Sequence, residues 1–410
     1  MFSKNKIDTD PKKINDILER SVSKIYPSKE ELRKKLLSGE RLVIYSGADA
    51  TGGELHLGHS TNFILLEKLR KLGHQIIVLF GDFTAQIGDP TDKGGSTRKM
   101  LTKKDVNKNL KTWEKQISNI LKIKDSKNPV KIVRNSKWLS KLSFEDVINL
   151  SSNFTVQQTI ERDMFQERLK NKKPIYMHEF FYPLMQGYDS VVLNCDLEIG
   201  GNDQTFNMLA GRTLLRKIKN KEKFVLTTTL LENPNTKEKL MSKSKGDYIS
   251  MEDNPEEMFG KVMALPDEVI IPMFIDTTLF SLNETDKIKI NLLSGELNPR
   301  DAKVKLAKEI IKIYHSEKAA EMAAENFEKT FKEGGVPDNV IEISKKEGDR
   351  LDEILLDEKI ISSKNEWRRL IDQNGLTIVG SGEKISDLNY LITETNTYRV
   401  GKKRFIKVVV

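Results

Sequence analysis

The stretch that decides the fold is R-L-V-I-Y-S-G-A-D-A-T-G-G-E-L-H-L-G-H-S-T-N-F-I-L-L-E-K-L-R-K-L-G-H-Q-I-I-V-L-F, residues 41–80. Its first six residues, 41–46, form an apolar run rich in β-forming side chains, which predicts a strand. After a glycine-rich loop, residues 60–72 carry apolar side chains at helical spacing and stop at Gly73. Residues 75–80 predict a second buried strand.

Strand, loop, helix and strand in this order make a βαβ unit, and such units build parallel sheets. Residues 1–40 predict helices before it. A further helix is expected over 179–193, running into a strand-like V-V-L at 191–193, and residues 223–231 are another strand candidate. We therefore predict an α/β fold: a doubly wound, Rossmann-like parallel-sheet domain, then an α-helical domain and a small α+β domain.

Changes in pattern along the chain predict the domain boundaries. Residues 1–235 are expected to form the Rossmann-like domain, with a helical insertion at about 135–185. Residues 236–331 are mostly amphipathic and helical, and residues 332–348 contain Gly-Gly and Pro, as a linker does. Residues 349–410 combine a helix-turn-helix pattern with short β runs, which predicts a separate small domain.

Length and composition indicate a globular protein. The chain has 410 residues, which is too long for a single ordinary core, so more than one domain is expected. Its residues are 38% hydrophobic and 31% charged, as is typical of globular proteins. No apolar run approaches the roughly 20 residues of a membrane helix, and the N-terminus lacks the pattern of a signal peptide. The single cysteine, Cys195, fits a reducing compartment, so we expect a cytoplasmic protein without membrane segments.

The charge of the chain is unevenly distributed. The net charge is +8, and residues 95–140 contain 13 Lys/Arg against 3 Asp/Glu. A lysine-rich solvated helix face and a phosphate-contacting surface are both compatible with this pattern. Trp113 and Trp138 are the only aromatic residues in it, which argues against stacking of single-stranded bases.

The first short motif is H-L-G-H, His56–His59, placed where the predicted helix begins. Gly58 lets a nucleotide approach the backbone, and the helix N-terminus offers free N–H groups to phosphate. Two histidines that lie about one helical turn apart can both donate hydrogen bonds as charge develops on phosphate oxygens. A capped helix with surface histidines is the alternative. Zinc would need further ligands that the motif lacks, so no dedicated metal site is predicted.

The second short motif is L-M-S-K-S, Leu240–Ser244, about 180 residues downstream. A lysine-containing loop is ordinary surface when it stands alone, but paired with H-L-G-H it indicates a loop that closes over a triphosphate. Lys243 is the residue we expect to act. The loop at 89–98 carries Lys93 and Arg98, which could hold pyrophosphate from the other side or form an exposed turn.

Further motifs add a resemblance to these two. Tyr45, Gly47, Asp49 and Thr51 form Y-x-G-x-D-x-T, and Y-P-L-M-Q-G-Y-D and G-G-N-D-Q occupy residues 182–189 and 200–204. The chain also contains G-D-F-T and I-G-D-P within 81–90, S-x-x-E-x-R-R-L-I at 363–371 and V-G-K-K-R-F at 400–405. With these motifs the chain resembles the bacterial-type tyrosyl-tRNA synthetases, which are class I aminoacyl-tRNA synthetases.

The resemblance implies a role for each matching residue. The tyrosine-binding residues would be Tyr45, Asp89, Tyr182, Gln186, Asp189 and Gln204. The ATP-binding residues would be Gly47, Asp49, Gly58, Gly201, Asp203, Met241, Ser242, Lys243 and Ser244. The catalytic residues would be Thr51, His56, His59, Lys93, Arg98 and Lys243. The RNA-binding residues would be Arg368, Arg369, Lys402, Lys403 and Arg404.

The residue types suit these roles. Tyr45 and Asp189 could together hold one phenolic O–H, and a phenylalanine would leave both without a partner. Tyr182, Gln186 and Asp189 are spaced to share one face of a helix. A partly buried polar helix face would produce the same spacing.

The resemblance also implies the reaction. ATP, carrying Mg²⁺, would be the co-substrate that activates L-tyrosine to tyrosyl-adenylate with release of pyrophosphate. The tyrosine would then pass to the 3′-terminal adenosine of tRNA(Tyr), and residues 349–410 would bind RNA. A homodimer is expected through the helical insertion at 135–185.

The chain departs from the family pattern in three places. Leu240 stands where the second motif usually has its first lysine, although Lys239 precedes it. Ala50 stands where proline is common, and V-G-S-G-E-K at 379–384 replaces an N-G-x-K turn.

Two other functions remain open at this point. One is a different H-x-G-H nucleotidyltransferase, and the other is an RNA-binding paralogue without catalysis. A tryptophan-specific relative is disfavoured, because Tyr45 and Asp189 suit a phenol rather than an indole.

Overall fold

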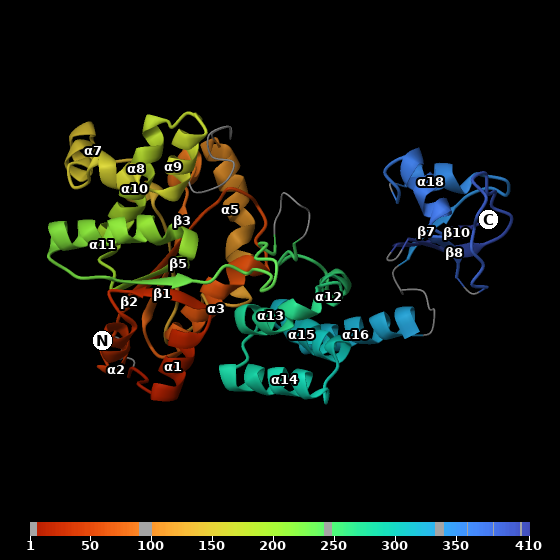
Figure 1. The fold of residues 1–410 in the computed structure, drawn as a ribbon, viewed down its shortest axis with the longest axis horizontal. Helices are drawn as coiled ribbons and strands as arrows, with labels where there is room; N and C mark the ends of the chain where they lie inside the picture. Colours follow the sequence, from red (N-terminus) through yellow and green to blue (C-terminus); the bar gives the residue numbers. More distant parts are fainter. Residues whose placement is uncertain are drawn as a thin grey trace. The chain divides into compact units, whose positions relative to one another are not determined.

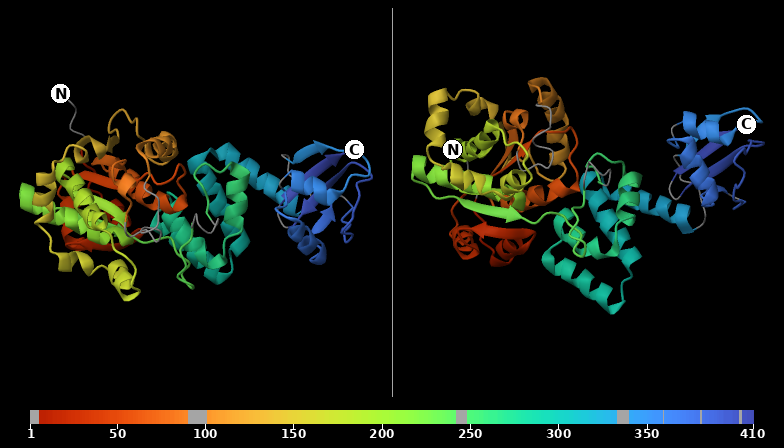
Figure 2. Two further views of the ribbon diagram at one scale, coloured as in Figure 1. Left: turned by 90° about the horizontal axis from the view of Figure 1, so that it is seen from above. Right: turned by 45° about the horizontal axis from the view of Figure 1, so that its top comes forward.

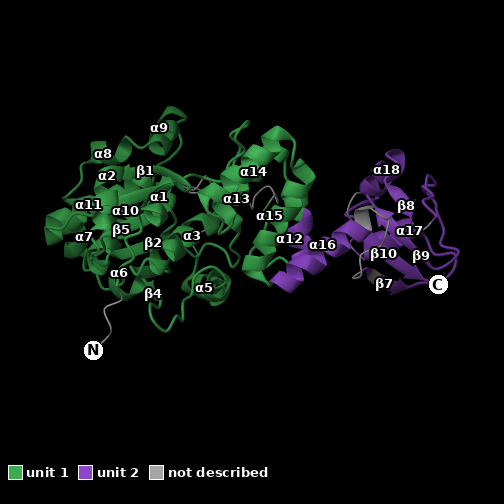
Figure 3. Cartoon of the chain, turned by 90° about the horizontal axis from the view of Figure 1, so that it is seen from below, with its two compact units in different colours: residues 1–254, 261–316 green, residues 255–260, 317–410 purple. Residues whose placement is uncertain are grey.

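The computed structural model describes residues 6–89, 101–241, 248–332, 340–358, 360–379, 381–401 and 404–410. The chain divides into two compact units, coloured separately in Figure 3. The larger unit comprises residues 1–254 and 261–316, and the smaller comprises 255–260 and 317–410. The helical segment that we expected at 236–331 is therefore shared between the two units.

The larger unit is built on a six-stranded sheet in the order β1-β6-β5-β2-β3-β4. β1 runs antiparallel to β6, and the other neighbours are parallel. Figures 1 and 2 show helices on both faces, α1 and α3 on one and α10 and α11 on the other. The predicted doubly wound α/β class is thereby confirmed. The strands are β1 (Val22–Tyr26), β2 (Val43–Asp49), β3 (Gln75–Gly81), β4 (Lys131–Arg134), β5 (Leu197–Gly201) and β6 (Phe224–Thr228).

The helices up to the end of the larger unit vary from one to five turns. The N-terminal ones are α1 (Pro11–Glu19), α2 (Lys29–Leu37), α3 (Leu57–Lys71), α4 (Thr84–Ile87), α5 (Lys103–Ser118), α6 (Ser136–Leu139), α7 (Phe144–Ser151), α8 (Val156–Ile160) and α9 (Asp163–Lys170). They are followed by α10 (Met177–Leu193), η1 (Asn202–Gln204), α11 (Thr205–Lys219), α12 (Pro255–Met263), η3 (Asp267–Val269), α13 (Ile270–Thr277), α14 (Leu282–Ser294) and α15 (Pro299–Tyr314).

The segment that predicted the fold forms the centre of this sheet. β2 and β3 pair in parallel from Val43 with Gln75 to Asp49 with Gly81, and α3 crosses between them. The helix ends before Gly73, whose φ of +103° a side chain would strain. The strands of the pair are buried on both faces, which explains their continuous apolar sequence.

Several sequence predictions need correction. The apolar run 191–193 is the last turn of α10 rather than a strand. Asn194, with φ +47°, ends the helix, and the strand begins at Leu197. The helical prediction for residues 1–40 missed the edge strand β1.

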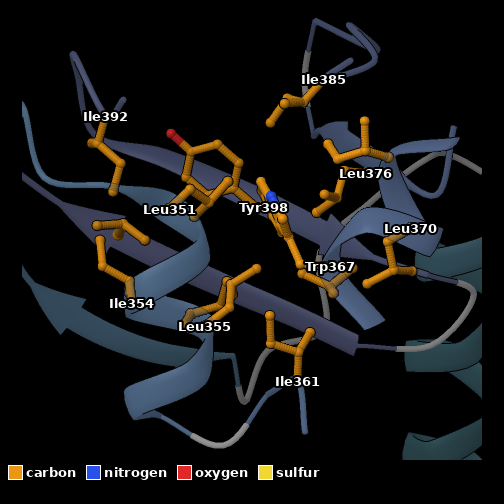
Figure 4. Close-up of a cluster of buried hydrophobic side chains, with 14 of the residues drawn as sticks. Leu351, Ile354, Leu355, Ile361, Trp367, Leu370, Leu376, Ile385, Ile392 and Tyr398 are labelled. Atoms are coloured by element: carbon orange, nitrogen blue, oxygen red, sulfur yellow. The ribbon is translucent and has the colours of Figure 1, made fainter. Parts of the chain in front are cut away.

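The smaller unit has its own core (Figure 4). Its sheet has the order β7-β10-β9-β8, in which β7 and β10 are parallel and the other pairs antiparallel. The indole of Trp367 and the ring of Tyr398 lie among aliphatic side chains from the helices at 351–357 and 364–372 and from the sheet. The elements are α16 (Glu317–Lys332), β7 (Ile341–Ser344), α17 (Leu351–Asp357), α18 (Lys364–Asp372), β8 (Leu376–Ile378), β9 (Asn396–Val400) and β10 (Arg404–Val409).

β7 lies inside the segment that we expected to be a linker, 332–348. Of the helices in the described parts of the chain, none combines the length and apolar character needed to cross a bilayer.

Candidate active site

The candidate site lies at the switch point of the sheet, where the order of the strands reverses. β2 has β3 on one side and β5 on the other, so the chain winds outward in both directions from this strand. Asp49, Gly81 and Gly201 are the last residues of these three strands. In open α/β sheets, ligands bind outside the carboxyl ends of the strands at such a switch point.

The first motif begins helix α3 at this edge. His56 caps the helix, and its Nδ1 accepts a hydrogen bond from the Gly58 N–H at 3.2 Å. His59 Nδ1 lies 3.2 Å from the His56 N–H, and the two ring centroids are 4.0 Å apart. Because both Nδ1 atoms face the backbone, hydrogen bonding to a phosphate falls to Nε2 of each ring. A Cβ on Gly58 would lie only 3.0 Å from the His56 ring, so any other residue here would require that ring to shift.

The second motif reaches the first in space. Met241 is buried, and its Cβ lies 3.6 Å from the place where a Cβ of Gly58 would be. The chain that returns after the loop pairs with the first motif, since the Leu57 N–H donates to the Ile249 carbonyl at 3.1 Å. The rest of this motif, including Ser242, Lys243 and Ser244, lies outside the described residues, as do Lys93 and Arg98.

Helix α5 holds the loop that precedes H-L-G-H. The Trp113 indole N–H donates to the Gly52 carbonyl at 2.9 Å, and Gln116 donates to Gly53 at 3.0 Å. Gln116 also accepts from the Leu55 N–H at 2.7 Å. Sequence reasoning noted Trp113 only as an aromatic residue of the basic stretch and missed Gln116, although their spacing on one face of a helix was visible.

The residues expected to read the phenol are both buried but have separate partners. Asp189 accepts from the Trp138 indole at 2.7 Å and from the Asn135 amide at 3.3 Å. Burial raises the pKa of Asp189 well above its usual range, and those two hydrogen bonds oppose the rise. The Tyr45 hydroxyl lies 2.8 Å from Ser190 Oγ.

Tyr182 is held by Asp49 rather than standing alone. Its hydroxyl donates to Asp49 Oδ2 at 2.8 Å, and Thr84 Oγ1 donates to Asp49 Oδ1 at 2.7 Å. Burial raises the pKa of Asp49 to about 7. A Cβ on Gly81 would lie 1.9 Å from Asp49 Oδ1, so the third strand must end in glycine here. Both oxygens of Asp49, expected at the nucleotide, are thus engaged by the protein.

Asp89 and Gln204, from opposite sides of the switch point, are brought together. The Gln204 amide donates to Asp89 Oδ2 at 2.7 Å, and Gln204 in turn accepts from Asn207 at 3.0 Å.

A residue that sequence reasoning missed also belongs to this region. Arg162 is 8% exposed and lies over the Phe206 ring at 4.7 Å, and within the described residues its terminal nitrogens have no hydrogen-bond partner. Burial lowers the pKa of this guanidinium, and the charge of Asp89 opposes the change.

The other expected ATP-site residues lie nearer the solvent. Gly47 and Asp203 are exposed, and the Thr51 N–H donates to the Asp49 carbonyl at 2.8 Å. Gln186, which was expected to bind tyrosine rather than ATP, donates to the buried Glu198 at 3.1 Å. Within the described ranges, no group of three or more His, Cys, Asp or Glu side chains could hold a metal ion.

In the smaller unit, Arg368 and Arg369 are exposed on α18. Arg404 forms an ion pair with Glu366 at 2.9 Å, which ties β10 to that helix. Lys402 and Lys403 lie outside the described residues.

A largely parallel sheet with H-L-G-H at its switch point, and with Met241 of the second motif beside Gly58, is the arrangement expected of a class I aminoacyl-tRNA synthetase. The chain belongs to the family of tRNA synthetases class I (W and Y), whose model matches residues 37–332. Within it, a tyrosine–tRNA ligase of Carboxydothermus hydrogenoformans is 42% identical over 96% of this chain and 97% of the relative. One from Haemophilus ducreyi is 41% identical over 96% of this chain and 97% of the relative.

Solved structures share the fold. A C-terminally truncated mitochondrial tyrosyl-tRNA synthetase of Aspergillus nidulans superposes with a TM-score of 0.67 at 20% identity, covering 78% of this chain and 94% of that one. Tyrosyl-tRNA synthetase of Archaeoglobus fulgidus, complexed with L-tyrosine, superposes with a TM-score of 0.59 at 23% identity, covering 77% of this chain and 99% of that one. The resemblance predicted from the motifs is confirmed.

Proposed function

We propose that this chain is a tyrosine–tRNA ligase, which activates L-tyrosine with ATP and transfers it to the 3′-terminal adenosine of tRNA(Tyr). The observation that carries the proposal is the meeting of the two motifs, Met241 against Gly58, at the sheet edge that also holds Tyr182 and Asp89. The relatives at 41–42% identity, named as tyrosine–tRNA ligases, support the same reaction.

In the first step, the carboxylate of tyrosine attacks the α-phosphate of ATP, and pyrophosphate leaves with Mg²⁺. Nε2 of His56 and of His59 would donate to the phosphate as negative charge builds on its oxygens. Lys243, Lys93 and Arg98 would neutralise the departing pyrophosphate, which stabilises the transition state more than the ground state. The carboxylate is already ionised, so positioning and charge stabilisation suffice without a general base.

Tyrosine would lie with its ring toward Tyr45 and Asp189. Its α-ammonium group would be held by Tyr182, Gln186 and Asp89. Three acceptor or hydroxyl groups around one ammonium match its three donors. Gln204, already bonded to Asp89, would lie toward the carboxylate of the substrate.

The adenosine and phosphates of ATP would lie along the solvent-facing side of the same edge. Gly47, Asp203 and Gly201 would contact the nucleotide. Asp49 would lie beside it, and the Asp49 backbone carbonyl accepts a hydrogen bond from the Thr51 N–H.

A homodimer is part of the proposal. Large apolar side chains are exposed on α7, α8 and α10: Phe144 (79%), Ile148 (51%), Val156 (68%) and Met177 (72%). Exposed apolar clusters of this kind mark interaction surfaces. They lie within the helical insertion that we expected to form the dimer interface, and we propose that a second copy of the chain covers them.

Arg368 and Arg369 would contact tRNA from the smaller unit.

The one cysteine, Cys195, is a free thiol, as is usual in a reducing compartment, and this supports the cytoplasmic location that we propose.

Aminoacylation of transcripts tests the proposal. The protein, ATP and labelled tyrosine should charge tRNA(Tyr) and leave tRNA(Trp) uncharged. A Lys243→Ala variant should form adenylate far more slowly but bind tyrosine with nearly the same affinity. A Lys219→Ala variant is the matched control, because it removes an exposed lysine at the end of α11, outside both motifs. Charging of tRNA(Trp) with tryptophan instead would contradict the assignment of the pocket.

A further inference from the structure

A buried ion pair lies directly behind the residues proposed to read tyrosine. Lys223 Nζ and Glu198 Oε2 are paired, and both side chains are at most 2% exposed. Glu198 on β5 is the register partner of Tyr45 on β2, so their side chains share one face of the sheet. Above that face, α10 places Gln186 and Ser190 one turn apart, in contact with the pair.

Five hydrogen bonds link these five side chains, and one of them joins Lys223 Nζ to Glu198 Oε2. Lys223 Nζ donates to Ser190 Oγ at 2.8 Å, and Ser190 Oγ donates to Glu198 Oε2 at 3.3 Å. Tyr45 is joined to Ser190 Oγ at 2.8 Å. The Gln186 amide nitrogen donates to Glu198 Oε1 at 3.1 Å.

The chemistry of the two charged groups gives this network a direction. An ammonium group can only donate, and a carboxylate can only accept. The single proton of Ser190 goes to the carboxylate, because a charged acceptor is the stronger one. Ser190 Oγ therefore accepts from both Lys223 and Tyr45. Burial raises the pKa of Tyr45, followed by the charge of Glu198, so its hydroxyl keeps the proton that it donates.

We propose that Glu198 and Lys223 are positioning residues for tyrosine selection, because they force Tyr45 and Gln186 to present acceptor atoms to the amino acid. With its own proton directed at Ser190, Tyr45 can offer only an oxygen lone pair to a ligand. With its nitrogen directed at Glu198, Gln186 offers its carbonyl oxygen. The side-chain pocket then selects a hydroxyl donor, and Gln186 selects an ammonium donor.

Asp189 is consistent with this assignment. A phenol has one proton to donate and an oxygen that accepts. Tyr45 offers a lone pair to that proton, and burial, which raises the pKa of Asp189 well above its usual range, disfavours the ionised carboxylate that would compete for it. Two acceptors facing one phenolic proton would instead leave one of them unpaired.

Gly211 on α11 makes room for the network. A Cβ on this residue would lie 2.6 Å from Ser190 Oγ and 2.7 Å from Lys223 Nζ. A Gly211→Ala substitution would therefore separate Lys223 from Ser190 without changing any charge.

The inference rests on the proposed function, and its test measures selectivity within that function. Pyrophosphate exchange is compared for L-tyrosine and 4-fluoro-L-phenylalanine, which has nearly the same shape but no proton to donate. In the unmodified protein, kcat/KM should favour tyrosine strongly. Glu198→Gln places an amide where the carboxylate was, frees the Ser190 proton for Tyr45, and should lower the tyrosine preference about tenfold. Glu222→Gln, an exposed change one residue before Lys223, should leave the preference within about twofold.

A double variant, Glu198→Gln with Lys223→Gln, distinguishes the loss of hydrogen-bond direction from the cost of leaving one buried charge unpaired. Removing one member of a buried pair leaves an uncompensated charge, whereas removing both often costs little. The double variant should regain stability, measured as Tm, but not the tyrosine preference. Recovery of the preference would overturn the proposal, because the pair would then be merely structural.

Should Glu198→Gln fail to fold, Gly211→Ala keeps the inference testable and should reduce the same preference. An unchanged preference in a folded Gly211→Ala protein would contradict it. Absence of any tyrosine-dependent exchange in the unmodified protein would instead overturn the proposed function itself.

Discussion

Asp49 shows how much one side chain contributes at this edge. It ends β2, and its carboxyl holds Tyr182 from the middle of α10 and Thr84 from α4. The ionised form accepts both hydroxyl protons most strongly, because a protonated carboxyl has lost its charge and uses one oxygen as a donor. The orientation of Tyr182 toward the ammonium group of tyrosine therefore depends on the charge of Asp49.

The raised pKa of Asp49, about 7, predicts a pH dependence of tyrosine binding. As pH rises through 7, Asp49 ionises and Tyr182 is held, so the Kd for tyrosine should fall roughly threefold to tenfold between pH 5.5 and 8.5. Calorimetric titration in the absence of ATP measures it without interference from catalysis. Asp49→Asn should lose this inflection, and an inflection of equal size in that variant would contradict the assignment.

The same residue has the opposite effect on stability. Its pKa is higher in the folded chain than the ordinary value of 3.8, so the folded state holds the proton more tightly. The free energy of unfolding should therefore decrease as pH rises from about 4 to 7 on account of Asp49. Asp49→Asn should show a shallower decrease in urea titrations at pH 5 and pH 7.5. An equal or steeper decrease would mean that other groups control this pH range.

At the residue scale, the sequence predicted the motif residues but not their supports. Tyr45, Asp189 and His56 stand in recognisable patterns. Glu198 and Lys223 do not, because their pairing joins β5 to the residue just before β6 and each looks like an ordinary surface charge in the sequence. Trp138 was noted only as part of a basic stretch, and its bond to Asp189 depends on the fold.

At the scale of elements, α5 acts as a support for the first motif. Its Gln116 side chain, 2% exposed, both donates to Gly53 and accepts from Leu55 in the loop before H-L-G-H. The loop contains no proline to stiffen it, since Ala50 stands where that residue is common in the family. The helix compensates by holding the loop through side-chain hydrogen bonds.

Gln116→Ala should therefore impair catalysis more than tyrosine binding. Loss of two buried hydrogen bonds leaves the loop free to move, and we expect kcat of exchange to fall about tenfold to a hundredfold while the Kd for tyrosine changes about twofold or less. Lys115→Ala, an exposed neighbour on the same helix, is the control. A variant that loses tyrosine affinity and retains kcat would show that α5 supports a different part of the site.

Elements with a strong pattern were predictable, and those set by pairing were not. The run 41–46 and residues 75–80 became β2 and β3, because continuous apolar sequence is typical of strands buried on both faces. β1 was missed because an edge strand needs no such run, and it forms only when β6 lies beside it. β7 was missed because its partner, β10, is some 60 residues away.

At the scale of the whole molecule, the smaller unit has an independent core and should be separable in function. Deleting residues 340–410, which removes β7 together with the rest of its sheet, should weaken tRNA charging by at least about tenfold, because Arg368 and Arg369 are removed, and leave pyrophosphate exchange nearly unchanged. Parallel exchange and charging assays measure the two effects. An equal loss of both activities would mean that this unit is structural.

The exposed apolar surface of α7 and α10 predicts the assembly state. Phe144→Glu and Met177→Glu place charges on the surface proposed to bind a second copy, so each should shift the protein toward monomer in sedimentation experiments. Leu293→Glu, at a residue also 79% exposed but located on α14, is the control and should leave the dimer intact. A protein that is monomeric before any substitution would contradict the proposed homodimer.

The central claim is that the switch point of this sheet activates tyrosine with ATP. Pyrophosphate–ATP exchange, run separately with each of the twenty amino acids, tests it most directly. The structure predicts exchange with L-tyrosine and exchange lower by orders of magnitude with phenylalanine and tryptophan. Exchange driven by another amino acid, or none with tyrosine, would contradict it.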